Sequence, residues 1–124
     1  MEPYYRLPSF EEVYLEDSWV RDINATNHYA EILVDTVLTE KNPQYTKPKP
    51  NEQYCYKNGK IFFSGPLKVK WIKKIMKPIP PYPGEEITYG NIDSFFYDKN
   101  CYKLKGSWGE LEIISQEPPK FEFV

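Results

Sequence analysis

The stretch YGNIDSFFYDKNCYKLKGSWG, from Tyr89 to Gly109, decides the fold of this chain. Two turn signals divide it: the run Asp98-Lys99-Asn100, and the pair Gly106-Ser107, which is a candidate for a type II′ turn. Between the turns, Tyr and Leu alternate with lysines, the period of a strand with one buried face. The stretch therefore predicts three successive β-strands. The segments upstream are also predicted to contain strands, and these need further strands to pair or pack with.

The composition favours the same class of fold. The chain has 124 residues, enough for one domain with its own core. It holds eleven tyrosines, seven phenylalanines and three tryptophans, and aromatic residues favour half-buried strands. Alanine, the strongest helix former, occurs only at Ala25 and Ala30. We therefore predict a single all-β domain.

Upstream of this stretch, periodicity predicts a long hairpin over 13–38, with a bend or bulge at Asp17-Ser18 and a turn at 24–27. Asn58-Gly59 is the strongest short hairpin signal and predicts a type I′ turn. A fifth strand follows over 67–75. About eight strands at short spacing predict an antiparallel sandwich or a flattened barrel.

The remaining segments are expected to be less regular. Residues 1–12 read as an irregular arm, in which Ser9 and Glu12 fit a capping box for one short helical turn. Residues 41–52 and 77–86 are proline-rich loops. Residues 117–124 are expected to form a tail or an edge strand.

Charge is unevenly distributed although the net charge is only −2. Residues 1–40 carry nine acids and two bases, residues 41–80 one acid and ten bases, and residues 81–124 eight acids and four bases. Pairing between oppositely charged strand faces explains this uneven distribution better than electrostatic steering of a charged partner does. Steering is the alternative. The basic run 68–77 around Trp71 suggests nucleic-acid binding only weakly, because the broad basic field of such proteins is missing.

The sequence gives no sign of secretion, membrane insertion or metal binding. The start, MEPYYRLPSFEE, lacks the features of a signal peptide, and no apolar run is long enough for a membrane helix. A cytoplasmic protein is expected. In that compartment Cys55 and Cys101 are expected to be small buried hydrophobes, with a disulfide as the alternative. Two cysteines and one histidine, His28, do not make a zinc site, so we expect neither metal nor cofactor.

Catalysis is not expected either. With one histidine and no nucleophile-elbow motif, a histidine-based triad is nearly excluded. A glycoside-type hydrolase that uses Asp93 with Glu110 is a less favoured alternative. The favoured interpretation is that Glu110 and Glu112 form a solvent face paired across strands with lysines, and that Asp93 is a polar anchor that accepts backbone N–H groups at a bulge or loop.

Two segments carry a family resemblance. GEEITYGNIDSFF, residues 84–96, and YKLKGSWGELEI, residues 102–113, resemble small bacterial β-rich proteins of the immunity-protein type found in polymorphic toxin systems. VYLEDSWV, residues 13–20, and the run 54–63 are similar to them to a lesser degree. The likeness is one of spacing and aromatic placement. It implies a stoichiometric binder without a cofactor, and it assigns no functional residues.

We therefore expect a non-enzymatic protein-binding module whose acidic N-terminal third covers a basic surface of a toxin. Exposed aromatic residues such as Tyr4 and Tyr5 would add anchors. The candidate partner-binding residues are Glu11, Glu12, Glu16, Asp17, Asp22, Tyr45 and Tyr82. A small-ligand-binding β-barrel is the alternative, and pairing of edge strands with other chains is a further one. The oligomeric state stays open.

Overall fold

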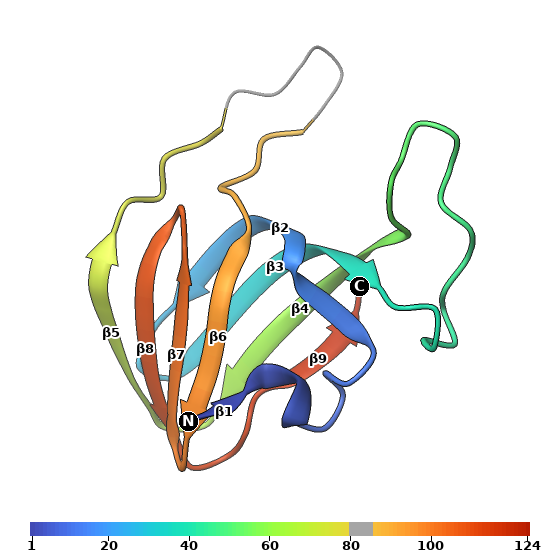
Figure 1. The fold of residues 1–124 in the computed structure, drawn as a ribbon. Coiled ribbons are helices and arrows are strands. Elements are labelled where there is room, and N and C mark those ends of the chain that lie inside the picture. Colours follow the sequence, from blue (N-terminus) through green and yellow to red (C-terminus); the bar gives the residue numbers. More distant parts are fainter. Residues whose placement is uncertain (80–85) are drawn as a thin grey trace.

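The computed structural model describes residues 1–79 and 86–124, which form two antiparallel β-sheets packed face to face (Figure 1). The five-stranded sheet has the order β1-β6-β7-β8-β5, and the four-stranded sheet has the order β2-β3-β4-β9. Within the described ranges the nine strands are β1 (Glu2–Pro3), β2 (Val13–Ala25), β3 (Tyr29–Leu38), β4 (Tyr56–Ser64), β5 (Leu67–Lys74), β6 (Ile92–Asp98), β7 (Cys101–Gly106), β8 (Gly109–Ser115) and β9 (Lys120–Phe123). The all-β sandwich is confirmed.

One hydrophobic core fills the space between the sheets. Alternate residues of the strands point inward, and the ring of Phe63 on β4 meets that of Tyr102 on β7 edge to face, with centroids 5.3 Å apart. The largest fully buried side chains are Trp108, Phe10, Phe63, Phe95, Leu15, Ile32, Ile61 and Ile92. The barrel alternative is therefore wrong, because two separate sheets close on a filled interior.

The stretch 89–109 forms the centre of the five-stranded sheet. The β6–β7 hairpin turns at Lys99-Asn100, where Lys99 adopts a φ of 54°. The β7–β8 hairpin pairs Gly106 with Gly109, so its turn is Ser107-Trp108, one residue later than predicted. The reason is packing: the Trp108 ring is fully buried and lies where a Cβ on Gly106 would be.

The same Trp108 ring contacts Trp71 on β5. The two ring centroids lie 6.1 Å apart at an interplanar angle of 85°. The pairing of β5 with β8 has an irregularity directly after Trp71, between Trp71 and Lys73. An aromatic pair thus joins the edge strand to the β7–β8 turn.

The predicted Asn58-Gly59 turn is wrong. Both residues lie inside β4, where Asn58 pairs with Asp35 and Gly59 with Val34 of β3. A Cβ on Gly59 would lie 2.5 Å from the Phe121 ring of β9, and glycine leaves room for that ring. Glycine inside a strand marks a close approach here rather than a turn.

The N-terminal arm is packed rather than loose. Its helical turn is a 3-10 turn at Tyr4–Arg6, earlier than the capping-box signal, and Ser9 accepts a hydrogen bond from the backbone N–H of Phe121 (3.0 Å) instead of capping a helix. Tyr4 is buried and stacks on Phe95 with ring centroids 5.7 Å apart. Its hydroxyl donates to Glu16 and accepts from the Leu15 N–H (3.0 Å). Tyr4 is therefore no exposed anchor.

The two sheets meet at one corner, where β2 pairs with the residues just before β6. The Val20 N–H donates to the Gly90 carbonyl (2.8 Å), and Asn91 Nδ2 donates to the Ser18 carbonyl (2.7 Å). The Asn91 carbonyl in turn accepts from Trp108 Nε1 (3.1 Å). Asn91 is thus the polar anchor of this region.

Asp93, predicted as a polar anchor at a bulge or loop, lies at the surface. Its side chain is exposed, although it does sit at a bulge, between Ile92 opposite Gly106 and Ser94 opposite Lys105. The side-chain hydrogen bond to the backbone in this region comes from Asn91, two residues earlier in the chain.

Other predictions concern the termini, the cysteines and membrane insertion. The tail forms β9, an edge strand paired with β4. Cys55 is buried, Cys101 is half-buried, and both are free thiols. Across residues 1–79 and 86–124, no helix has the length and apolar character to cross a membrane.

Candidate protein-interaction face

Irregular pairing between β2 and β3 shapes a surface on the outer face of the four-stranded sheet. The register between β2 and β3 shifts between Tyr14 and Trp19, which confirms the predicted bulge. Ser18 holds this bulge: it is fully buried, its hydroxyl donates to the Tyr14 carbonyl (2.6 Å), and it accepts from the Val37 N–H (2.9 Å). The bulge brings Trp19 opposite Asp35.

Aromatic rings and carboxylates gather on this surface. Tyr14 lies opposite Val37, which lies opposite Tyr56, and the rings of Tyr54 and Tyr56 meet edge to face at 6.2 Å. The Asp17 carboxylate acts on the Tyr54 phenol. The carboxylates of Asp35, Asp17 and Glu52 act on the Tyr56 phenol. We call this surface the aromatic–acidic face and define it as Tyr14, Asp17, Trp19, Asp35, Glu52, Tyr54 and Tyr56.

The electrostatics of this face follow from partial burial. Loss of solvent raises the pKa of Asp35, against the opposing effect of Arg21, and Glu52 raises it further. The hydrogen bond to Asp17 raises the pKa of the Tyr54 phenol, and burial raises that of Tyr56. Arg21 is ion-paired with Glu86. The carboxylates of this face therefore outnumber the cation that lies beside them.

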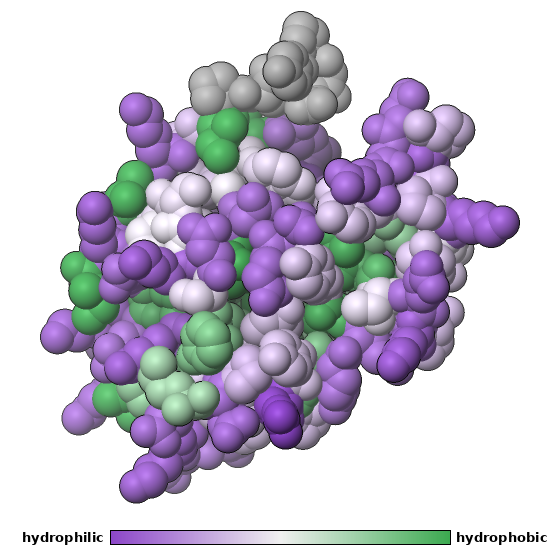
Figure 2. Space-filling view, viewed as in Figure 1, coloured by the Kyte–Doolittle hydropathy of each residue, from purple (hydrophilic) through white to green (hydrophobic). Residues whose placement is uncertain are grey.

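The loop that joins β3 to β4 covers one end of this face. It begins where Thr39 N–H and Asn42 Nδ2 donate to the backbone carbonyl of Glu12, at 3.2 and 3.1 Å. Thr46 N–H donates to Cys55 Sγ (3.4 Å), which holds the middle of the loop to the sheet. Figure 2 shows the loop as a mostly hydrophilic projection beside the body of the sandwich.

A groove of about 360 Å³ lies between this loop and the sheet. Its floor is apolar, with Val37, Leu38 and Cys55. Its remaining lining is Tyr14, Thr39, Glu40, Tyr45, Pro48, Gln53 and Tyr54. The volume falls in the lower part of the range of about 300–1,000 Å³ typical of ligand pockets.

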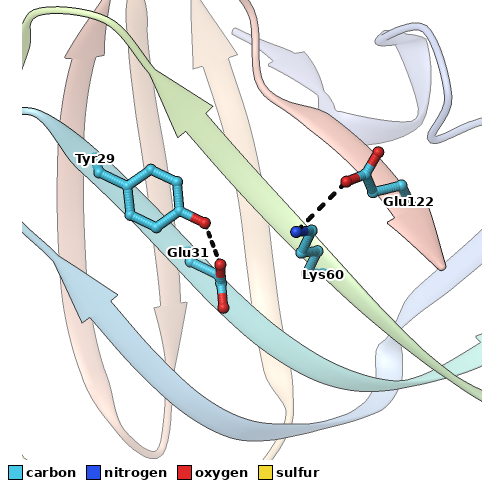
Figure 3. Close-up of polar contacts among 4 residues, drawn as sticks. All are labelled: Tyr29, Glu31, Lys60 and Glu122. Atoms are coloured by element: carbon cyan, nitrogen blue, oxygen red, sulfur yellow. Dashed lines mark hydrogen bonds and ion pairs between the residues drawn. The ribbon is translucent and has the colours of Figure 1, made fainter. Parts of the chain in front are cut away.

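The opposite end of the outer face is a polar network rather than an aromatic cluster. Tyr29 donates a hydrogen bond to Glu31 on β3, and Lys60 of β4 lies 3.4 Å from Glu122 of β9 (Figure 3). The Lys60–Glu122 ion pair offsets one carboxylate at that end, whereas the phenol that is bonded to Glu31 carries no charge. The three carboxylates of Asp17, Asp35 and Glu52 lie at the end near the groove.

The structure brings some of the predicted partner-binding residues to this face. Asp17 belongs to it, and the exposed Asp22 lies on the same outer side of β2, opposite Leu33. Tyr45 lines the groove, but it is half-buried against the core rather than a free anchor.

The other predicted residues lie elsewhere. Glu11 and Glu12 lie in the turn before β2, and the Glu16 carboxylate accepts the Tyr4 hydroxyl. Tyr5 is 50% exposed at the arm. Tyr82 lies outside the described residues.

Sequence reasoning missed Trp19, Asp35, Tyr54 and Tyr56 as members of one surface. Alternation along 29–38 does place Asp35 on the side opposite Ile32 and Val34. Its neighbours across the sheet depend on the β2 bulge and on the continuous path of β4. The strand register therefore had to be known first.

The outer face of the other sheet behaves as predicted. Glu110 lies opposite Lys105 and Glu112 opposite Lys103, and Lys105 Nζ is 3.4 Å from Glu110. These carboxylates are paired with lysines across strands, as the favoured interpretation expected. β7 lies between the strands that carry Asp93 and Glu110.

Metal coordination finds no support in the part of the chain that the structure describes. No group of three His, Cys, Asp or Glu side chains there is placed to hold a metal ion.

Comparisons with protein-family models, with curated proteins and with solved structures give no match for this chain.

Proposed function

We propose that this protein is a non-enzymatic protein-binding module of the immunity-protein type, which neutralises a toxin by covering a basic surface on it. The observation that carries the proposal is the aromatic–acidic face. It combines four aromatic rings with three carboxylates beside a groove, on the outer face of the four-stranded sheet and the connection that leads into β4.

This combination suits protein recognition for physical reasons. Tyrosine and tryptophan offer large contact area at low conformational cost and are enriched among the residues that dominate binding energy. Unbalanced carboxylates attract a basic partner and accelerate encounter. The acidic N-terminal third of the chain supplies Asp17, Asp35 and Trp19 to this face.

The test starts with the partner. The product of the adjacent gene should co-purify with this protein and bind with a Kd of about 1 μM or tighter. It should lose its toxicity when the two are co-expressed. If the gene product neither binds at that concentration nor is inhibited, the proposal fails.

A charge-reversal pair then locates the interface. Asp17→Lys combined with Asp22→Lys should weaken binding at least about tenfold, because like charges would face each other. Glu117→Lys is the matched control, since Glu117 is exposed on the connection between β8 and β9. An equal loss with Glu117→Lys would place the interface elsewhere.

A further inference from the structure

The groove beside the aromatic–acidic face has tyrosine rings and a carboxylate, that of Glu40, in its lining. Tyr54 lines the groove, and the Asp17 carboxylate acts on its phenol closely enough to raise its pKa, so that carboxylate lies beside the groove rather than in its lining. Tyr14 lies close to the Tyr54 phenol. Rings of this kind attract cations to their faces.

The charge inside the groove has one sign. Glu40 is the charged residue among those that line it in the described ranges. The loop also carries Lys41, Lys47 and Lys49, but these are exposed and are not part of the lining. A cationic group that enters the groove would therefore meet carboxylates and aromatic rings.

We infer that this groove receives an arginine side chain of the protein partner. This inference rests on the proposed function. Arginine fits better than lysine because its planar guanidinium stacks on a ring and donates two parallel hydrogen bonds to one carboxylate. Its aliphatic stem suits the apolar floor of Val37 and Leu38. Asp17 accepts the guanidinium, and Tyr14 and Tyr54 flank it.

A peptide series isolates this interaction. The probe is acetyl-Ala-Arg-Ala-amide, with the citrulline peptide as a neutral isostere and the lysine peptide as a compact cation. Binding to the whole chain is followed by the NMR shifts of the Trp19 indole and of the Tyr54 and Tyr14 rings. We expect the citrulline peptide to bind at least about fivefold more weakly than the arginine peptide, and the lysine peptide to fall between them.

Isosteric variants assign the carboxylate. Asp17→Asn should weaken binding of the arginine peptide about fivefold and weaken the citrulline peptide less, because the neutral ureido group donates hydrogen bonds to the carboxylate but forms no ion pair with it. Asp98→Asn, which changes an exposed acid at the end of β6 in the other sheet, is the control and should change the binding of neither peptide. Replacing Tyr54 by Leu should weaken both peptides, since the ring contributes contact area as well as cation attraction.

Three results would overturn the inference: equal affinity for the arginine and citrulline peptides, shifts confined to another surface, or no shift at about 10 mM arginine peptide, a concentration that reveals very weak sites. These failures are distinct from failure of the proposed function. A partner that binds tightly and is insensitive to Asp17→Asn would leave the binding module in place and remove its arginine contact.

Discussion

Single residues decide where the strands of this sandwich meet, and Gly59 is the clearest case. Gly59→Ala would place a methyl group 2.5 Å from the Phe121 ring and 3.1 Å from Thr36 Oγ1. Because Phe121 is buried, the ring cannot simply move into solvent. We expect a loss of about 1–3 kcal/mol in the free energy of unfolding, measured by urea denaturation.

The neighbouring position supplies the control for this variant. Asn58→Ala changes an exposed side chain of the same strand and should alter stability by no more than about 0.5 kcal/mol. Adding Phe121→Leu to Gly59→Ala should recover part of the loss, since a smaller side chain leaves room for the methyl group. Additive losses in the double variant would show that the two residues do not conflict.

The polar anchor at the corner of the two sheets gives a second residue-level prediction. Asn91→Ala removes the donor to the Ser18 carbonyl and should cost about 1–2 kcal/mol of unfolding free energy. Asp93→Ala should change stability by less than about 0.5 kcal/mol, because that side chain is exposed. A larger loss for Asp93→Ala than for Asn91→Ala would restore the role first expected of the carboxylate.

At the scale of elements, Tyr4 fastens the N-terminal arm to β2. Tyr4→Phe keeps the stacking on Phe95 but removes the hydroxyl that donates to Glu16 and accepts from the Leu15 N–H. At neutral pH we expect the variant to be less stable by about 1–2 kcal/mol.

The difference in stability between the original chain and its Tyr4→Phe variant depends on pH with a definite sign. Burial, and then the hydrogen bond to Glu16, raises the pKa of the Tyr4 phenol above its value of about 10 in the unfolded chain. Below that pH both states keep the proton and the contribution is complete. Above it, the unfolded chain loses the proton first and the contribution declines. Urea denaturation at rising pH should therefore show the two proteins converging above about pH 10.

A matched exposed tyrosine checks this interpretation. Tyr5→Phe, in the same helical turn, should leave stability unchanged at both neutral and alkaline pH. If Tyr4→Phe instead lowered stability by the same amount at every pH, the hydroxyl would not be protected from ionisation.

Most elements could be predicted from the sequence because their side chains alternate. The long β2–β3 hairpin, the fifth strand and the strands around residues 92–115 show the two-residue period directly. The Asn58-Gly59 error has a different origin. Turn prediction uses only the local backbone preferences of neighbouring residues. Glycine is needed at position 59 because the Phe121 ring of β9, far along the chain, lies against it.

On the scale of the whole molecule, charge is divided between surfaces. The outer side of β2 and β3 carries Asp17, Asp22 and Asp35, whereas β5 carries Lys68, Lys70, Lys73 and Lys74 at one end of the other sheet. Exposed charges act at long range only over the Debye length, about 8 Å at physiological salt. Orientation of an approaching partner should therefore depend on ionic strength.

Association kinetics test this expectation. The association rate with a captured partner should fall about tenfold between about 0.02 and 0.3 M salt, with a smaller change in the dissociation rate. The double variant Asp17→Asn, Asp22→Asn should show a shallower dependence. A rate that is independent of salt would exclude electrostatic guidance by this face.

The candidate site could be predicted only in part. The acidic character of the N-terminal third is visible in the sequence, and it points to Asp17, a member of the aromatic–acidic face, and to Asp22 on the same side of β2. Tyr4 was misjudged because nothing local shows that its ring stacks on Phe95. Tyr54 and Tyr56 come just before the predicted Asn58-Gly59 turn in the sequence, and their place beside Trp19 follows from strand register rather than from any motif.

The contact between Trp71 and Trp108 gives the protein a built-in optical reporter. Two indoles nearly perpendicular and with centroids 6.1 Å apart are close enough for their electronic transitions to couple, so we expect a paired band in the far-ultraviolet circular dichroism spectrum. The band requires β5 and the β7–β8 turn to be assembled together. Its loss on heating would therefore report the opening of the five-stranded sheet separately from the backbone signal of the molecule as a whole.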